Sequence, residues 1–323
     1  MLWLLAIGLA VAIVAGIDWQ AGQRERAAEA AYPPKGQIVD VDGVGIHVYD
    51  AGGTGPDLVL IHGANGNIRD FSDALLNRLT QAYRVWLVDR PGLGWSDRSD
   101  PEYLGPWSRA SESPAEQARV LQAAVARLGV ERPLVLGHSF GGAVALAWAL
   151  ERPDHIAGLV VVSGASNPWP DGLGAFYNVS ATRLGGATFV PFVTAFASKA
   201  QANTVIARIF APQEAPKDYA RLVGVPLSLR RESQRANTRQ VTSLLPHVVE
   251  MSARYGAIAV PTEILHGTAD DIVPLAIHSE PLAQQIPDAV LTRLDGIGHM
   301  PHHATPEAVI DAVDRAAARA GLR

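Results

Sequence analysis

Short runs of apolar residues recur along the chain, and segments with helical character separate them. Such a run, bounded by turn residues, is typical of a strand that is buried on both faces of a sheet. We expect strands over residues 58–61, 85–88, 134–136, 156–162, 262–265 and 290–294. The expected helices are residues 71–79, 114–128, 140–151 and the chain from Pro306 onward. Strands that alternate with helices indicate an α/β fold whose mostly parallel central sheet is flanked by helices.

The segment before the first buried strand has a different pattern, because apolar and polar residues alternate in it. Residues 38–41 and 44–49 alternate around Asp42-Gly43, a dipeptide that is typical of a β-hairpin turn. The pattern therefore predicts a hairpin at the start of the folded part. His47 falls on its polar side, so we expect a solvated side chain there.

The pattern changes again from Ser166 to about Ala257, where no buried strand run occurs and prolines recur. We expect this segment, residues 166–257, to form a mainly helical cap inserted before the strand at 262–265. Its clearest helices are predicted over residues 194–210 and 239–255. Residues 36–165 and 258–323 then form the core.

The N-terminus carries an uninterrupted apolar stretch, residues 1–17, which ends at Asp18. As a helix this stretch reaches about 26 Å, close to the roughly 30 Å of a bilayer core. We therefore expect a single-pass transmembrane anchor over residues 1–17, and a polar connector over residues 18–35 that leads to the folded part.

Cleavage of the same stretch as a signal peptide is the alternative, and the mature protein would then be secreted or periplasmic. Ala28-Glu29-Ala30 resembles a signal cleavage site, but it lies far from the end of the apolar stretch. Arg24, Arg26 and Lys35 follow the span, which favours a cytoplasmic folded part.

Composition limits the possible chemistry. The 323 residues carry a formal net charge of -5 and show no basic stripe, so we expect no nucleic-acid partner. The absence of cysteine excludes disulfides, thiolate metal ligands and a cysteine nucleophile. The sequence does not define an oligomeric state.

One turn in the expected sheet has the form of a nucleophile site. Gly137-His138-Ser139-Phe140-Gly141 joins the strand at 134–136 to the helix at 140–151. In a G-x-S-x-G turn the serine is held in a strained, exposed position, and the flanking glycines avoid a steric clash. The start of the following helix offers free N–H groups to a developing oxyanion. Ser139 is therefore a candidate nucleophile.

A serine hydroxyl needs a base, usually a histidine that a carboxylate orients. Asp270 and His299 follow the last two expected strands, whose carboxyl ends meet Ser139 at one edge of a parallel sheet. Asp271 is the nearest rival of Asp270, and Asp295 is a weaker one.

The chain resembles the α/β-hydrolase fold family from the hairpin at Ile38 to the C-terminal helix, apart from the insertion. Four motifs carry the resemblance: His62-Gly63 after a strand, Asp89-Arg90-Pro91-Gly92-Leu93-Gly94-Trp95-Ser96, Gly137-His138-Ser139-Phe140-Gly141, and the Asp270 and His299 loops in that order.

The resemblance implies roles at the matching positions. Ser139 would be the nucleophile, His299 the base and then the acid, and Asp270 the residue that orients the imidazole. The backbone N–H groups of Ala64 and Phe140 would form the oxyanion hole. We expect His62 and His266 to brace their loops by hydrogen bonds.

Substrate contacts are expected from Asn65, from His138 beside the nucleophile, and from Trp169 in the cap. Cap aromatics are candidates for lining an apolar acyl pocket, or for forming the small core of the cap: Trp169, Phe176, Tyr177, Phe189, Phe192, Phe196 and Phe210.

The expected activity is hydrolysis of carboxylic esters with small or medium apolar acyl groups, without cofactor. His299, His302 and His303 invite a metal hypothesis, but Pro301 interrupts the helix that would align them, and we expect no metal. C–C bond hydrolysis of ring-cleavage products, for which cap arginines (Arg183, Arg208, Arg230, Arg231) would suit an anionic substrate, remains an alternative. So do a cofactor-free perhydrolase and a membrane-tethered binding module.

Overall fold

A single sheet of eight strands forms the centre of the molecule in the computed structural model, which describes residues 2–170 and 172–323. The spatial order is β1-β2-β4-β3-β5-β6-β7-β8. The strands are β1 (Gln37–Val41), β2 (Val44–Gly52), β3 (Asp57–Ile61), β4 (Arg84–Val88), β5 (Leu134–His138), β6 (Gly158–Val162), β7 (Thr262–Gly267) and β8 (Ala289–Leu294). Strand β2 pairs antiparallel with β1 and β4, and all other pairs are parallel. The predicted hairpin and mostly parallel sheet are confirmed.

Helices cover both faces of this sheet, because successive strand residues point to opposite sides. In β5, Val135 joins the apolar cluster under α3 (Pro114–Ala126) and α4 (Phe140–Glu151). Its neighbours Leu134 and Leu136 join the cluster under α2 (Asp73–Leu79) and α13 (Pro306–Arg319). The short helices of the core are η1 (Ile68–Asp70), η2 (Pro101–Tyr103), η3 (Pro153–His155), η5 (Tyr255–Ala257), α11 (Ser279–Gln285) and α12 (Pro301–Ala304).

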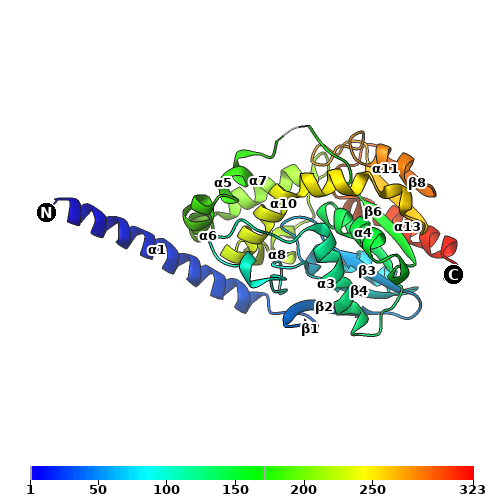
Figure 1. Cartoon of the computed structure of the whole chain (residues 1–323), viewed down its shortest axis with the longest axis horizontal. Coiled ribbons are helices and arrows are strands. Elements are labelled where there is room, and N and C mark those ends of the chain that lie inside the picture. The colour runs from blue at the N-terminus through cyan, green and yellow to red at the C-terminus, as the bar shows by residue number, and fades with distance from the viewer. Residues whose placement is uncertain (1, 171) are drawn as a thin grey trace.

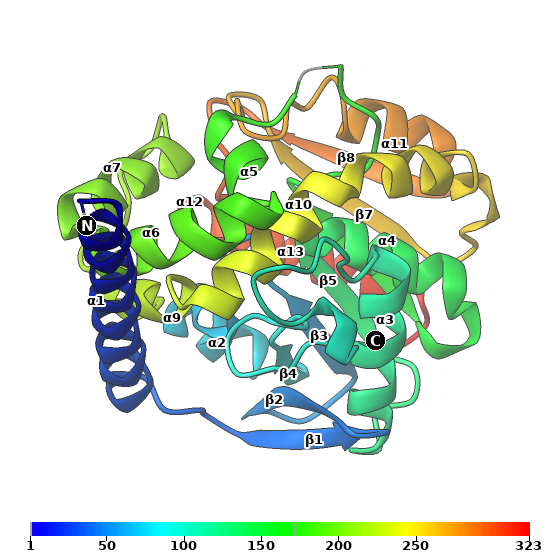
Figure 2. The same ribbon diagram turned by 60° about the vertical axis from the view of Figure 1, so that its left-hand side comes forward.

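The segment between β6 and β7 is helical, and in Figures 1 and 2 it lies over one end of the sheet. We refer to it as the cap. Its helices are α5 (Ala175–Ser180), η4 (Gly185–Phe189), α6 (Val190–Phe196), α7 (Lys199–Phe210), α8 (Tyr219–Leu222), α9 (Val225–Ser228) and α10 (Arg231–Ser252).

Two predicted cap helices differ from the observed ones. The predicted helix 194–210 is divided at Ser198, because this serine caps α7 in a reciprocal capping box with Gln201. The predicted helix 239–255 begins earlier, at Arg231. The first turns of this helix are polar but buried against other elements, so the apolar pattern does not show them.

The N-terminal segment is one continuous helix, α1 (Leu2–Ala31), so the expected connector from Asp18 is wrong over residues 18–31. This part is rich in alanine, glutamate and arginine, which favour helix, and it packs against the cap through Ala21, Gly22 and Ala28. Residues 2–16 are exposed throughout and project away from the body of the molecule (Figure 1). Helix α1 is long and apolar enough to cross a membrane, and a signal sequence has the same properties.

Candidate active site

Ser139 lies in the turn between β5 and α4 with a φ of 53°, in the left-handed region that non-glycine residues rarely occupy. The turn is so tight that a Cβ on Gly137 would lie 2.1 Å from the carbonyl oxygen of Gly141. A Cβ on Gly141 would lie 2.3 Å from the carbonyl oxygen of Ile61 in β3. Glycine at both positions therefore allows the strained turn.

The structure brings the three predicted triad residues into one chain of hydrogen-bond contacts. The Nε2 atom of His299 lies 3.0 Å from Ser139 Oγ, and its Nδ1 atom lies 2.8 Å from Asp270 Oδ2. All three side chains are buried. The rival Asp271 is exposed, and Asp295 accepts a hydrogen bond from Thr268. The geometry therefore selects Asp270 as the partner of His299.

Asp270 sits in surroundings that keep its carboxyl group ionised. Burial opposes ionisation, but contacts from His266 and His299 outweigh it and hold the pKa well below its ordinary value. Its Oδ1 atom accepts from the backbone N–H groups of Ile272 and Val273, at 3.0 and 2.9 Å. The Nε2 atom of His266 lies 3.1 Å from Oδ2 and 2.6 Å from the carbonyl oxygen of Val273. His266 therefore braces this loop, in agreement with the prediction.

The loop after β3 is fixed through one carbonyl group. The oxygen of Gly63 accepts from His62 Nδ1 and from Arg90 Nη1, both at 2.9 Å. In a trans peptide the carbonyl and the next N–H point in opposite directions, so fixing this oxygen also fixes the N–H of Ala64. In the described residues 2–170 and 172–323, neither the N–H of Ala64 nor that of Phe140 has a hydrogen-bond acceptor. Both groups are free to bind an anionic oxygen.

Arg90 is fully buried and lies between the loop after β3 and the turn that holds Ser139. Its guanidinium carbon lies 3.9 Å from the ring centre of Phe140, the residue after Ser139. Burial lowers the pKa of Arg90 to about 9. Burial also lowers the pKa of His62 to about 4, and Arg90 adds to the effect, so the imidazole is neutral at pH 7. Its Nε2 atom accepts from the Arg90 N–H at 3.0 Å.

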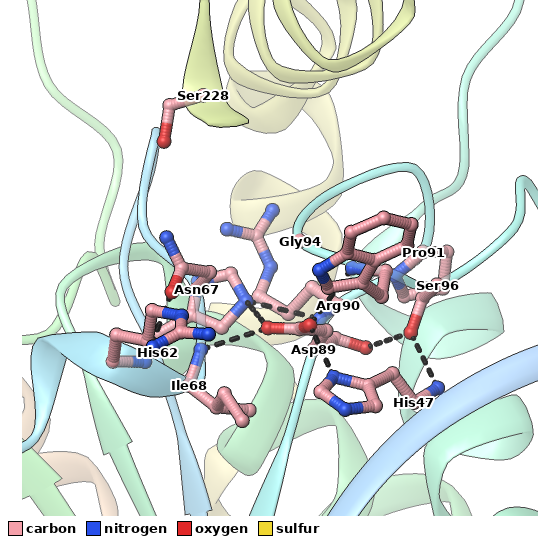
Figure 3. A network of polar contacts seen from close by, with 12 residues as sticks. His47, His62, Asn67, Ile68, Asp89, Arg90, Pro91, Gly94, Ser96 and Ser228 are labelled. Atoms are coloured by element: carbon pink, nitrogen blue, oxygen red, sulfur yellow. Dashed lines mark hydrogen bonds and ion pairs between the residues drawn. The ribbon is translucent and has the colours of Figure 1, made fainter. Parts of the chain in front are cut away.

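A buried carboxylate, Asp89, holds the neighbouring backbone in place (Figure 3). Its Oδ1 atom accepts from the N–H of Ile68 at 2.7 Å, and its Oδ2 atom accepts from the N–H of Trp95 at 2.8 Å. His47 Nδ1 lies 2.6 Å from the same Oδ2 atom. The prediction of a solvated His47 is therefore wrong: the loop from Asp89 to Ser96 covers this side of the hairpin, and His47 is 1% exposed.

Two of the three predicted substrate-binding residues, Asn65 and His138, contact other parts of the protein. The backbone N–H of Asn65 donates to Asn237 Oδ1 of α10 at 2.7 Å, and its carbonyl accepts from Ser228 Oγ of α9 at 2.6 Å. Asn65 thus ties the loop after β3 to the cap. His138 is buried, and its Nε2 atom donates to the carbonyl oxygen of His299 at 2.9 Å. Substrate contact by either residue stays a prediction.

The cap aromatics that could line an acyl pocket or form the small core of the cap lie in different surroundings. Trp169 packs at the edge of the main apolar cluster, and its ring centre lies 5.9 Å from that of His278. Phe210 packs between the cap and the core, against Tyr219 on one side and against Met300 and His303 on the other. Phe192 and Phe196 are 50% and 51% exposed, so they point to the outer surface.

A second cluster of polar side chains, around the Asp70 carboxylate, lies near His299. Tyr219 OH donates to Asp70 Oδ1 at 2.5 Å, and the Nε2 atoms of His303 and His302 lie 3.4 and 3.5 Å from the Asp70 carboxylate. Asp70, His138 and His302 present ligand atoms within 4.8 Å of one another and are buried, so they could contact one small cation. Spacing along the sequence did not indicate this group, because Asp70 comes from η1, far from the histidines in the chain.

Comparison with known proteins assigns the family. The model of the alpha/beta hydrolase fold matches residues 56–306, and the chain therefore belongs to the α/β-hydrolase fold family.

Several relatives fit this assignment. The chain is 29% identical over 269 residues to a pimeloyl-[acyl-carrier protein] methyl ester esterase of Aromatoleum aromaticum, covering 78% of this chain and 94% of the relative. It is 25% identical over 257 residues to a 2-hydroxy-6-oxononadienedioate/2-hydroxy-6-oxononatrienedioate hydrolase of Cupriavidus pinatubonensis, with 79% and 84% covered. The solved structure of a thermophilic esterase from Thermogutta terrifontis is similar in fold, with a TM-score of 0.69, 23% identity and coverage of 88% and 98%.

Proposed function

We propose that the protein is a serine hydrolase that cleaves carboxylic esters through an acyl-enzyme. The observation that carries the proposal is the contact chain from Ser139 through His299 to Asp270, at 3.0 and 2.8 Å. A serine, a histidine and an ionised carboxylate in this order activate a hydroxyl for attack on a carbonyl carbon.

In the proposed mechanism His299 Nε2 takes the proton of Ser139 as Oγ attacks the ester carbonyl. Asp270 holds the Nδ1–H of His299 and stabilises the imidazolium that forms. The N–H groups of Ala64 and Phe140 bind the oxyanion, each contributing about 2.7–4 kcal/mol to transition-state stabilisation. His299 then protonates the leaving alcohol, and water, deprotonated by the same imidazole, hydrolyses the acyl-enzyme.

The arrangement of the cap arginines favours an ester over a dianionic ring-cleavage product. Such a dianion needs cations in the site, as buried charges require partners. Arg230 and Arg231, two of the four candidates, are paired with Glu29 and Glu25 of α1. Arg183 and Arg208 are exposed.

We also propose that α1 stays attached and anchors the protein in a membrane. The exposed apolar part of α1 would be unstable in water, whereas the hydrocarbon core of a bilayer would stabilise it. Residues 18–31 pack on the cap, so cleavage at Ala30 would remove side chains on which the cap depends.

A panel of p-nitrophenyl esters with graded acyl chains tests the activity, with a ring-cleavage dienoate and a perhydrolysis assay run beside it. We expect ester hydrolysis that Ser139→Ala abolishes without changing thermal stability. Faster turnover of the dienoate, or peracid formation as the main activity, would assign one of the alternative reactions. No turnover of any substrate would favour a binding module.

A further inference from the structure

The outer surface of the cap carries a concentration of exposed apolar side chains. Phe192 and Phe196 of α6 are about half exposed, and their ring centres lie 5.1 Å apart. Other large apolar side chains exposed on neighbouring cap elements are Phe176, Val179, Leu184 and Val205. Outside α1, such side chains are otherwise scattered over the described residues. Exposed apolar side chains concentrated in one segment are a feature of interaction sites.

The charge of the same segment is one-sided. Residues 172–213 contain Arg183, Lys199 and Arg208 but no aspartate or glutamate. The whole chain has 32 acidic residues in 323, about one in ten, so a stretch of this length would ordinarily contain about four. Cations beside apolar side chains suit the surface of an anionic bilayer, where each basic residue contributes about 1 kcal/mol.

Helix α1 fixes where this surface lies relative to a membrane. Arg24 donates to the carbonyl oxygens of Ala195 and Ala197, at 3.0 and 2.9 Å, on either side of Phe196 in the chain. Arg24 lies seven residues beyond Ile17, where the apolar stretch ends, and this is about 10 Å along the helix axis. The end of α6 is therefore held near the depth of the lipid headgroups of a bilayer that contains residues 2–17.

The overall arrangement agrees with this placement. In Figure 1 the cap helices α5, α6 and α7 lie at the end of the molecule toward which the free part of α1 projects. The strand β8 and the C-terminus lie at the opposite end. Trp19, which is 63% exposed, stands two residues beyond the apolar stretch, where interfacial tryptophans are enriched.

We propose that the outer surface of α5, α6 and α7 rests on the anionic lipid bilayer that holds α1. Two attachments then fix the orientation of the molecule, with the cap toward the lipid and β8 away from it. In its functional part this inference rests on the proposed esterase activity: substrates reach the site from the bilayer, and the preferred class is amphiphilic esters dissolved in lipid.

The absence of cysteine allows a direct test on the full chain. Single-cysteine variants Phe192→Cys, Phe196→Cys and Val290→Cys are labelled with an environment-sensitive fluorophore and reconstituted in vesicles of phosphatidylcholine and phosphatidylglycerol in equal parts. Val290 is the matched control, since it is 43% exposed on β8. Doxyl lipids in the same vesicles report the depth of each probe.

We expect blue-shifted emission and quenching by shallow doxyl lipids at positions 192 and 196, and neither at position 290. Probes at 192 and 196 that stay in water while the protein sediments with the vesicles would overturn the proposal. Failure of the full chain to sediment with vesicles would overturn it as well.

A kinetic comparison tests the functional part separately. The double variant Phe192→Asp/Phe196→Asp should hydrolyse a soluble short-chain ester at the wild-type rate, and a vesicle-borne ester about tenfold more slowly or worse. A double variant that hydrolyses the vesicle-borne ester as fast as the wild type does would contradict delivery from the bilayer. If no ester is hydrolysed, the proposed function fails, while the fluorescence result still decides the orientation.

Discussion

The hydrogen-bond contacts of the Asp270 carboxylate determine the orientation of the candidate triad. The carboxylate accepts two backbone N–H groups at Oδ1, and contacts two imidazoles at Oδ2. This geometry leaves Asp270 one orientation and gives His299 one tautomer, with the proton on Nδ1. The Nε2 atom is then unprotonated and faces Ser139, as a general base must be.

Replacement of Asp270 by asparagine should therefore cost much more activity than replacement of its neighbour. We expect Asp270→Asn to lower kcat by about 10⁴-fold, because an amide favours the wrong tautomer of His299. The exposed Asp271→Asn variant is the matched control and should keep most of its activity. Steady-state kinetics on a p-nitrophenyl ester measure both, and the reverse ranking would transfer the role to Asp271.

The sequence predicts the candidate site residues that directly follow strands. It does not predict residues whose partners come from distant parts of the chain. Ser139, Asp270 and His299 each come directly after a buried strand, and the topology of a parallel sheet brings them to one edge. The prediction of a solvated His47 is wrong because the burial of His47 depends on the loop at Asp89, more than 40 residues away in the chain. Asp70 and Asn237 meet their partners through the cap and η1, and no local pattern shows this.

At the scale of elements, the N-terminal helix and the cap behave as one unit. Glu25 of α1 accepts from the backbone N–H of Arg231 at 2.7 Å and from two nitrogens of its guanidinium, at 2.9 and 2.6 Å. These contacts lie at the first residue of α10, whose Asn237 holds the loop after β3. Attachment of α1 is thus connected through α10 to the candidate oxyanion hole.

Removal of the charge at Glu25 should loosen this unit. We expect Glu25→Gln to lower the free energy of unfolding by about 1–2 kcal/mol, since the pair is mostly buried and bidentate. The matched control is Glu307→Gln, whose pair with Arg78 is exposed and should contribute less than about 0.5 kcal/mol. Thermal unfolding of the full chain in detergent measures the difference. Equal effects of the two substitutions would show that α1 is not a structural part of the cap.

The sequence predicted the strands and the helices of the core because their periodicity is local. It did not predict the extent of α1, since the residues after Asp18 are polar and interrupt the apolar stretch, although their alanine, glutamate and arginine content favours helix. The bounds of the two predicted cap helices are wrong because a capping box at Ser198 divides the first and a polar segment from Arg231 begins the second. The short helices α8 and α9 have no apolar period of their own, so the pattern does not show them.

At the scale of the whole molecule, several buried histidines make stability depend on pH. Burial lowers the pKa values of His62, His278 and His302 to about 4, below the 6.5 of an exposed histidine. Between pH 6.5 and about 4 the unfolded chain binds these protons and the folded chain does not, so stability falls as the pH falls through this window.

Chemical denaturation at a series of pH values tests this dependence. We expect the midpoint to be constant above about pH 7 and to decrease steadily from pH 6.5 toward 4.5, with each fully titrating group contributing up to about 1.4 kcal/mol per pH unit. The exposed His155 serves as a control, because His155→Gln should leave the profile unchanged. A midpoint independent of pH over this range would contradict neutral burial of the three histidines.

Reaction with a fluorophosphonate probe, followed by peptide mass spectrometry, tests whether Ser139 is the activated nucleophile, because only an activated serine is phosphonylated. We expect one adduct, on Ser139, which is lost in Ser139→Ala and forms far more slowly in His299→Ala. Absence of an adduct on the folded wild-type protein, or an adduct that persists in Ser139→Ala, would contradict this assignment.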